Sequence, residues 1–322
     1  MAHLKITLAN LYEKYAQKLE LELQAGHRGM HRCIPLPEAQ RPGLGLTGYV
    51  KGISSKRILL FGKAEISYLR ELTPGLCLLR LQAVLRAQVP AVILAHNQRP
   101  PKMLRHLCEE LAIPLFRSRL TTIKLQSHLM ALLSVQFAPT ICCHGSLVEV
   151  FGMGVLIQGE SAIGKSEAAL GLIERGHRLV SDDLVKVRKL DTGLEGFGVE
   201  VTRHHMEVRG IGIINVAALF GVACVVEKKS LDIVVKLEVW DDTHFYDRAG
   251  IEEKTVTILG SEVPYHLLPV KPGRDVVLLL ETVALNRRLQ TAGFHAAREL
   301  DHQLLAAIAT RAHCRTLGKQ MI

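Results

Sequence analysis

The chain contains Gly159-Glu160-Ser161-Ala162-Ile163-Gly164-Lys165-Ser166, which is a glycine, four residues and then Gly-Lys-Ser. This spacing is typical of a phosphate-binding loop. Glycines let the backbone curl so that successive N–H groups point at phosphate oxygens, and the helix that follows adds its positive N-terminal end. Lys165 can then reach the β- and γ-phosphates, and the Ser166 hydroxyl can ligate magnesium. We therefore expect a nucleotide site here, with a structural turn as the alternative.

The residues on either side of this loop favour the nucleotide site. Val155-Leu156-Ile157 has the length of a buried strand, and residues 167–175 have the apolar spacing of a helix that stops at Gly176. Strand, glycine loop and helix form the order that such a loop needs. Upstream, residues 148–151 and the strand flank Gly152-Met153-Gly154, which predicts a hairpin leading into the loop.

Length and composition indicate a soluble protein of two domains. The chain has 322 residues, of which 48% are hydrophobic and 22% charged, an ordinary globular balance. No run of about eighteen uncharged apolar residues is present, so we expect no membrane span. Residues 1–20 lack the apolar core of a signal peptide, and the seven cysteines show neither C-x-x-C pairs nor metal spacing. These features favour a cytoplasmic protein with buried, reduced thiols.

The net charge of +9 is compatible with an anionic partner such as nucleic acid, an acidic protein or a nucleotide. However, lysine and arginine are dispersed along the chain, and aromatic residues are only 5% of it. Nucleic-acid binding usually needs basic residues gathered on one face, often with aromatics. We therefore expect no nucleic-acid partner.

The first half predicts a small α/β domain with a mainly parallel sheet, because strands and helices alternate at short intervals. Residues 1–20 are expected to form one helix. Further strands are expected at 57–62, 90–95 and 113–116, and helices at 67–72, 100–111 and 120–137. Ala138-Pro139-Thr140 marks a boundary, because proline disfavours helix in the residue before it. We expect one domain over residues 1–137 and a phosphate-loop domain over residues 138–322.

Past the loop helix, the second half predicts further strands and a helical end. Strands are expected at 178–185, 230–240, 255–259 and 276–280, followed by a mostly helical stretch over 281–309 that is interrupted near Gly293.

Two adjacent acids, Asp182 and Asp183, follow the apolar run 178–181 in this strand context, where acids are disfavoured. Because side chains alternate along a strand, only one of the two can easily face the phosphate loop. A carboxylate there could hold magnesium or accept a hydroxyl proton during phosphoryl transfer. A solvated strand end or turn explains the pair equally well.

Three further segments contain candidate groups. In Met206-Glu207-Val208-Arg209-Gly210-Ile211-Gly212-Ile213-Ile214-Asn215, Glu207 is a candidate metal ligand and Arg209 a candidate phosphate contact, and a plain surface hairpin is the alternative. The basic turn Pro269-Val270-Lys271-Pro272-Gly273-Arg274 could clamp a phosphate or be a solvated loop. His144 lies one hairpin before the phosphate loop, but a lone histidine is more often structural.

Taken together, these segments resemble the HPr kinase/phosphorylase family, bacterial enzymes that phosphorylate a seryl residue of the phosphocarrier HPr. The resemblance is carried by GESAIGKSE (159–167), ERGHRLVSDD (174–183), MEVRGIGIINV (206–216), YDRAG (246–250) and PVKPGR (269–274). It spans the whole second half, and more loosely the first half through RILLFGKAEIS (57–67) and the residues around 115–120. The phosphate loop occurs in many proteins, whereas ERGHRLV-x-DD and EVRGIGIINV are specific.

The resemblance implies a role for each candidate. Lys165 binds phosphate, Ser166 and Glu207 hold magnesium, and Asp183 is the general base for phosphorylation and the general acid for the reverse reaction. His144 and Arg248 match positions treated as active-site residues. Residues 206–215 match the segment needed for both reactions, and residues 269–274 the loop tied to dephosphorylation.

The resemblance also implies ATP and Mg²⁺ as cofactors, inorganic phosphate and pyrophosphate in the reverse reaction, HPr as the partner, and a homohexamer built from C-terminal domains. One residue departs from the family pattern. Ala162 stands where the family usually has a second glycine, and its methyl group disfavours positive φ. The loop fold is still expected, with nucleotide affinity in question.

Two other classes of function stay open from the residues. A small-molecule kinase on the same nucleotide core would need a pocket with dedicated substrate groups, and we identify none. A nucleotide sensor without catalysis would have no need of a base such as Asp183 beside Lys165 and Ser166. Replacing Asp183 by Asn separates these ideas, because nucleotide binding should survive while transfer collapses if Asp183 is the base.

Overall fold

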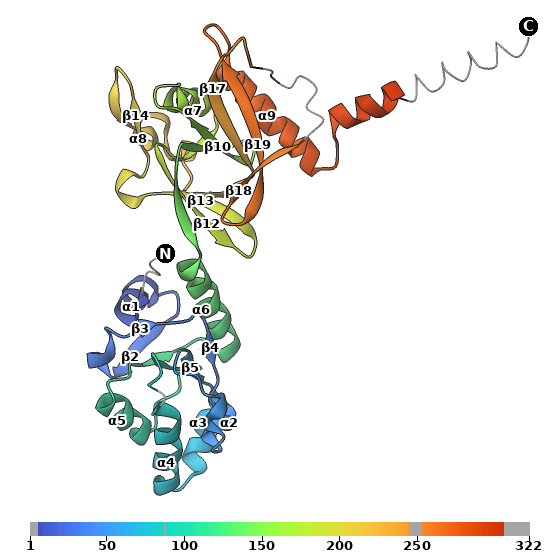
Figure 1. Cartoon of the computed structure of the whole chain (residues 1–322). Coiled ribbons are helices and arrows are strands. Elements are labelled where there is room, and N and C mark those ends of the chain that lie inside the picture. The colour runs from blue at the N-terminus through green and yellow to red at the C-terminus, as the bar shows by residue number, and fades with distance from the viewer. Residues whose placement is uncertain (1–5, 87, 245, 247–252, 306–322) are drawn as a thin grey trace, which may run out of the picture. The chain divides into compact units, whose positions relative to one another are not determined.

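The computed structural model describes residues 6–86, 88–244, 246 and 253–305 (Figure 1). By contacts within the chain it divides into two units, Met1–Ala138 and Pro139–Ile322. The N-terminal unit contains a five-stranded sheet in the order β2-β7-β6-β5-β4. Neighbouring strands from β7 to β4 are parallel, and β2 is antiparallel to β7. The strands are β2 (Leu21–Ala25), β4 (Ala39–Gln40), β5 (Ile58–Phe61), β6 (Val92–Leu94) and β7 (Leu115–Ser118).

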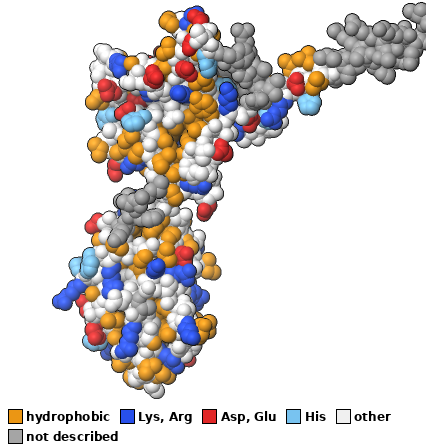
Figure 2. All heavy atoms as spheres, viewed as in Figure 1, with side chains coloured by type: hydrophobic (Ala, Val, Ile, Leu, Met, Phe, Trp, Pro, Cys, Tyr) orange, Lys and Arg blue, Asp and Glu red, His pale blue; other side chains and the backbone are white. Residues whose placement is uncertain are grey.

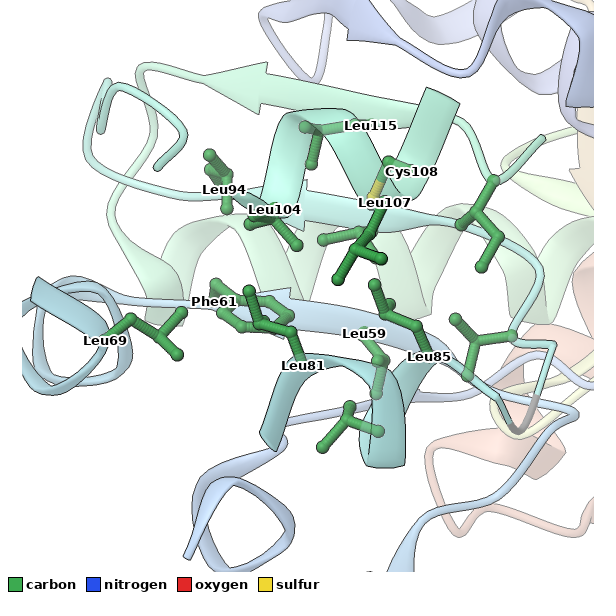
Figure 3. Packing of buried hydrophobic residues seen from close by; sticks show 14 of the residues in the cluster. Leu59, Phe61, Leu69, Leu81, Leu85, Leu94, Leu104, Leu107, Cys108 and Leu115 are labelled. Carbon is green, nitrogen blue, oxygen red and sulfur yellow. The ribbon is translucent and has the colours of Figure 1, made fainter. Parts of the chain in front are cut away.

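Helices cover both faces of this sheet because its central strands are apolar on both sides. In β5, Leu59 and Phe61 pack with α3, α4 and α5, as Figure 3 shows, whereas Ile58 and Leu60 pack with α1 and α6. The helices are α1 (Leu8–Tyr15), α2 (Gly43–Leu46), α3 (Lys63–Glu71), α4 (Pro74–Leu85), α5 (Lys102–Glu110) and α6 (Thr122–Phe137). The short strands β1 (Ile6–Thr7) and β3 (Cys33–Ile34) pair beside them. The expected α/β class with a mainly parallel sheet is confirmed.

Helix α1 is shorter than the single helix expected over residues 1–20. The Thr7 side chain caps its N-terminus by accepting from the Asn10 N–H at 3.2 Å. The chain then turns at Glu20, where φ is +49°, and Leu21 begins β2. Helix α4 was not anticipated, although Pro74 at its first turn is a typical start signal.

The C-terminal unit has a six-stranded sheet in the order β11-β9-β10-β17-β19-β18 and a four-stranded sheet in the order β16-β13-β12-β8. In the larger sheet β10, β17 and β19 are parallel, and β9 forms the expected antiparallel hairpin with β10. The larger sheet comprises β9 (Ser146–Val150), β10 (Met153–Gly159), β11 (Arg178–Ser181), β17 (Ile233–Val239), β18 (Lys254–Ile258) and β19 (Ser261–Val270). The smaller comprises β8 (Thr140–His144), β12 (Leu184–Leu190), β13 (Gly193–Gly198) and β16 (Lys228–Ser230).

The C-terminal unit therefore has three layers. One face of the larger sheet packs on α7 (Lys165–Glu174), α9 (Val276–Thr291) and the hairpin of β14 (His205–Val208) and β15 (Gly212–Asn215). The other face packs on the smaller sheet through residues such as Leu156, Val185 and Val234. The short helix α8 (Val216–Phe220) follows the hairpin. The phosphate loop therefore follows an interior strand with apolar contacts on both faces.

Two local expectations were wrong. Residues 276–280 are not a strand but the first turns of α9, whose N-cap Asp275 accepts from the Leu278 N–H at 2.9 Å. The strand expected over residues 178–185 is interrupted at Asp182 and Asp183, which lie in the turn between β11 and β12, with Asp183 at φ +63°, so for this pair the alternative of a turn is confirmed. The thiols are also less uniform than expected, because Cys77 and Cys108 are buried whereas Cys33 and Cys142 are exposed.

The surface agrees with the charge argument. On the face shown in Figure 2, lysine and arginine are interspersed with acidic and apolar side chains. Among the described residues, no helix is both long and apolar enough to cross a membrane.

Candidate active site around the phosphate loop

The phosphate loop connects the C-terminal end of β10 to the N-terminus of α7. Gly159 has φ +150°, and a Cβ there would lie 2.7 Å from the Leu237 carbonyl oxygen, so this position needs glycine. Gly164 has φ +98° immediately before the helix. The Lys165 ammonium donates to the carbonyl oxygens of Gly159 at 3.1 Å and Glu160 at 2.8 Å. The Lys165 ammonium therefore lies beside the loop backbone, within reach of a phosphate held by the N–H groups of the loop.

Ala162 adopts the backbone conformation that the sequence called into question. Its φ is +71°, in the left-handed region that residues with a Cβ rarely adopt. The loop therefore keeps its fold with an alanine at this position, but with local strain.

Asp182 is the acid whose side chain faces the phosphate loop. It is 7% exposed and accepts hydrogen bonds from the Ser166 hydroxyl at 3.0 and 3.2 Å and from the Ser146 hydroxyl at 2.5 Å. Burial raises the pKa of Asp182, and the hydrogen bonds from both serines and from the backbone of Asp183 and Glu207 only partly oppose this. The sequence predicts that one acid of the pair faces the phosphate loop but does not distinguish Asp182 from Asp183.

Asp183, the second acid of the pair, differs from Asp182 in exposure. It is exposed, and its carbonyl oxygen accepts from the Gly145 N–H at 3.0 Å. His144 ends β8 and pairs in register with Leu184, the next residue after Asp183. The structure therefore brings the two predicted catalytic residues, His144 and Asp183, to the ends of adjacent strands.

The β14–β15 hairpin lies against the phosphate-loop helix. Met206 and Val208 are buried in the same core cluster as Ala168 and Ala169 of α7. The alternate residue Glu207 is exposed, and its backbone N–H bonds to Asp182. At the tip, the Arg209 guanidinium approaches the Ser161 hydroxyl at 3.5 Å. Residues 206–215 thus form a hairpin, as the alternative of a plain surface hairpin predicts, but this hairpin contacts the phosphate loop.

Within residues 269–274, Pro269 and Val270 end β19 and the other four residues form the turn that follows it. Because β10, β17 and β19 are parallel, their C-terminal ends lie at one edge of the sheet, so this turn and the phosphate loop share that edge. Arg274 donates to the Pro269 carbonyl oxygen at 3.0 Å, and the Lys271 ammonium lies 5.7 Å from the Trp240 ring. Arg248, the remaining predicted catalytic residue, lies outside the described residues.

The donors at the loop suit a hard divalent cation. Ser166 and Asp182 offer a hydroxyl and a carboxylate in contact, and Mg²⁺ prefers few protein oxygens together with substrate phosphates. Exposed Glu207 is next to this pair, because its backbone N–H bonds to Asp182. Within the described ranges no group of three or more His, Cys, Asp or Glu residues is placed to hold a metal ion.

Comparison with known proteins gives one consistent result. The family model described as HPr Serine kinase N terminus matches residues 6–133, and that of the HPr Serine kinase C-terminal domain matches residues 135–304. An HPr kinase/phosphorylase of Treponema pallidum is 43% identical over 294 residues, 91% of this chain and 92% of the relative. One of Bacillus cytotoxicus is 39% identical over 305 residues, 94% and 97%. The solved Hpr(Ser) kinase/phosphatase from Coxiella burnetii is 36% identical, covers 51% of this chain and 98% of its own, and has a TM-score of 0.46.

Proposed function

The chain belongs to the HPr serine kinase family, and from that premise we propose that it is a kinase and phosphorylase of the phosphocarrier HPr. In the forward direction it transfers the γ-phosphoryl group of ATP to a seryl hydroxyl of HPr. In the reverse direction inorganic phosphate removes that group as pyrophosphate. The supporting observation is the contact of the Ser166 hydroxyl with Asp182 beside Lys165 at the end of strand β10, with Asp183 the next residue in the same turn.

The forward reaction needs positioning and charge neutralisation more than covalent help. Asp183 is exposed, so its carboxylate is accessible to a serine of a protein substrate and can accept the hydroxyl proton. As the serine oxygen bonds to the γ-phosphorus, the bond from that phosphorus to the bridging oxygen breaks, and ADP leaves. Lys165 and Arg209 offset the charge on the transferred group.

The reverse reaction uses the same residues with a different acceptor. An oxygen of inorganic phosphate bonds to the phosphorus of phosphoserine, the phosphorus–serine oxygen bond breaks, and pyrophosphate forms. Asp183, protonated in this direction, returns the proton to the serine oxygen, as microscopic reversibility requires. Lys271 and Arg274 in residues 269–274, at the same edge of the sheet as the phosphate loop, are the further cations that we assign to this direction.

Magnesium belongs to this proposal. Ser166, Asp182 and Glu207 would hold it, directly or through water, and when bound it supplies further charge neutralisation on the phosphate oxygens. Asp182 accepts the hydrogen bond that the Ser166 hydroxyl donates, which leaves the lone pairs of that oxygen available to a metal.

We also propose a cytoplasmic homohexamer that binds neither nucleic acid nor membrane. The dispersed basic residues support the first of these exclusions. Self-association is supported by α9, on which Leu278, Leu285 and Leu289 are between 41% and 53% exposed along one side of the helix.

One experiment tests both activities. ATP labelled on the γ-phosphate is incubated with Mg²⁺, the purified chain and purified HPr, and inorganic phosphate is added afterwards. We expect label on a serine of HPr, followed by its loss as labelled pyrophosphate. Nucleotide binding without label on HPr would refute the proposal and favour a small-molecule acceptor or a sensor.

A further inference from the structure

Ser146 carries a buried hydroxyl near the phosphate loop to which the proposed reaction gives no role. It begins β9, is 1% exposed, and donates to Oδ1 of Asp182 at 2.5 Å. A hydroxyl that donates to a carboxylate at this distance forms a strong, charge-assisted hydrogen bond. Most side-chain hydrogen bonds go to backbone groups or to water, so a bond between two buried side chains 36 residues apart is unusual.

The register of the larger sheet brings these two side chains together. β11 and β9 are antiparallel, with Ser181 opposite Leu147. Asp182, the next residue, therefore comes opposite Ser146, and opposed residues of an antiparallel pair have Cβ atoms about 5 Å apart. The register shifts between Leu179 and Ser181, so β11 has one extra residue, which reverses the face that the following side chains take. The bulge thus gives Asp182 the same face of the sheet as Ser146.

That face of the sheet is the one that α7 covers. Side chains alternate along β9, and Val148, two residues after Ser146, packs in the same cluster as Ala169 of α7. Ser146 lies at the end of β9 nearest the phosphate loop, because it pairs with Ile157, two residues before Gly159. The buried carboxylate is therefore held between one hydroxyl from the sheet and one from the first turn of α7.

The two hydroxyls bind the oxygens of Asp182 unequally. Ser166 Oγ lies 3.0 Å from Oδ2 and 3.2 Å from Oδ1, whereas the Ser146 hydroxyl bonds to Oδ1. Backbone N–H groups of Asp183 and Glu207 also donate to this carboxylate. Without Ser146, the side-chain donor left to Oδ1 in the described structure is the longer, shared bond from Ser166. The carboxylate could then rotate about its Cβ–Cγ bond.

We propose that Ser146 is a positioning residue for the divalent cation, because it fixes Oδ1 of Asp182 and so leaves Oδ2 for the Ser166 hydroxyl and the metal. The proposal rests on the proposed function, in which Ser166 and Asp182 hold magnesium. Hydrogen bonds that orient metal ligands typically change metal affinity by about 10–100-fold when they are removed. Binding of a nucleotide without metal depends on the N–H groups of the loop and on Lys165, whose ammonium bonds to loop carbonyl oxygens and not to Ser146.

The test measures ADP binding to the full chain by calorimetry, with saturating Mg²⁺ and without metal, so no transfer takes place. The ratio of the two affinities gives the coupling between metal and nucleotide. In Ser146→Ala this ratio should fall about tenfold, while the affinity for metal-free ADP stays within about twofold of wild type. Ser118→Ala is the matched control, because Ser118 is as fully buried but donates to the Leu19 carbonyl oxygen rather than to an acid. It should change neither affinity.

Further variants separate positioning from folding. Ser146→Cys keeps the size of the side chain but donates only weakly, so it should lower the ratio without leaving a cavity, whereas Ser146→Thr keeps the hydroxyl and should restore most of the ratio. Asp182→Asn should lower the ratio by itself, and adding Ser146→Ala to it should lower the ratio no further, because Ser146 acts through that acid.

Two results would overturn the proposal. One is an unchanged ratio in both Ser146→Ala and Ser146→Cys. The other is an equal loss of metal-free and metal-bound affinity in these variants, which would mean that Ser146 only supports the fold. A wild-type chain whose ADP affinity does not respond to Mg²⁺ would instead refute the proposed magnesium site itself, and a chain that binds no ADP would refute the proposed kinase.

Discussion

Among the described residues, each unit has one buried acidic side chain, and the two are surrounded differently. Glu65 in the N-terminal unit is 5% exposed and accepts from the Arg41 guanidinium at 2.9 and 3.0 Å and from the Gly62 N–H at 2.9 Å. Asp182 in the C-terminal unit is 7% exposed, and its described partners are serine hydroxyls and backbone N–H groups. No lysine or arginine in the described ranges forms an ion pair with Asp182.

The pKa values of the two acids shift in opposite directions as a result. Burial raises the pKa of each carboxyl group. For Glu65 the hydrogen bonds from Arg41 and from backbone N–H groups outweigh burial, so its pKa is lowered. For Asp182 they do not, so its pKa is raised. The N-terminal unit therefore neutralises its buried charge internally, whereas the C-terminal unit leaves an acid at the phosphate loop whose missing counter-charge a bound cation can supply.

The largest effect on phosphoryl transfer should come from Asp183, the exposed acid next to Asp182. Asp183→Asn should lower transfer in both directions by about 10³-fold, because the general base is lost while the loop stays intact. Labelled-phosphate transfer and nucleotide titration on the same preparation measure this. Asp191→Asn, at an exposed turn of the same unit, is the control. Retained transfer in Asp183→Asn would remove this residue from the mechanism.

Asp182→Asn removes the charge of the buried acid in the C-terminal unit and so tests its difference from Glu65. This variant keeps an acceptor for Ser166 but removes the negative charge, so the Mg²⁺ concentration for half-maximal kinase activity should rise roughly 10–100-fold. A magnesium titration at saturating ATP measures the change. An unchanged magnesium requirement would mean that Asp182 only shapes the loop.

The N-terminal counterpart is Glu65→Gln. Loss of the Glu65 charge that pairs with Arg41 should destabilise the β5–α3 region by about 1–2 kcal/mol. This value is lower than that of a fully buried pair, because Arg41 is half exposed. Hydrogen exchange of residues 58–71 measures this, with exposed Glu71→Gln on the same helix as control. Transfer activity should not change. If Glu65→Gln lowers transfer activity as far as Asp182→Asn does, then the two buried acids do not differ in function as we infer.

The pH dependence of the same region follows from the sign of the shift. Because the folded-state pKa of Glu65 is lowered from its ordinary value of 4.5, its contribution to stability is complete above pH 4.5 and is lost as pH falls through the folded-state pKa. The difference in protection between wild type and Glu65→Gln should therefore narrow below pH 4.5. A difference that widens on acidification would contradict the assigned partner.

Backbone strain gives the smallest effect. An alanine adopts positive φ in each unit, Ala112 in the N-terminal unit and Ala162 in the phosphate loop, although residues with a Cβ rarely do so. Ala162→Gly removes this strain but makes the chain more flexible, so ATP should bind about two- to fivefold more tightly, as a calorimetric titration can show. Gly164→Ala, at φ +98°, should act in the opposite direction. Equal affinities in all three proteins would show that the loop is not strained when it binds.

The parts of the site that could be predicted from the sequence are those that depend on residues close together along the chain. The β9–β10 hairpin, the loop and α7 each follow from glycine spacing and apolar period within a few residues. The contact of Asp182 with Ser166 could not be predicted, because it depends on β11 pairing with β9 and on a turn between β11 and β12. Residues 276–280 were misjudged because five apolar residues suit a strand as well as a helix. The N-cap Asp275 just before them was the overlooked signal.

The β9–β10 hairpin also bears on how the chain folds during synthesis. Val155 pairs with Val148 across the tight turn, but with Ile233 only after a long intervening stretch of chain. Local pairings form before distant ones, because closing a short loop loses less entropy. We therefore expect β10 to have one edge covered soon after it leaves the ribosome. An apolar strand with both edges open would otherwise be a site for aggregation.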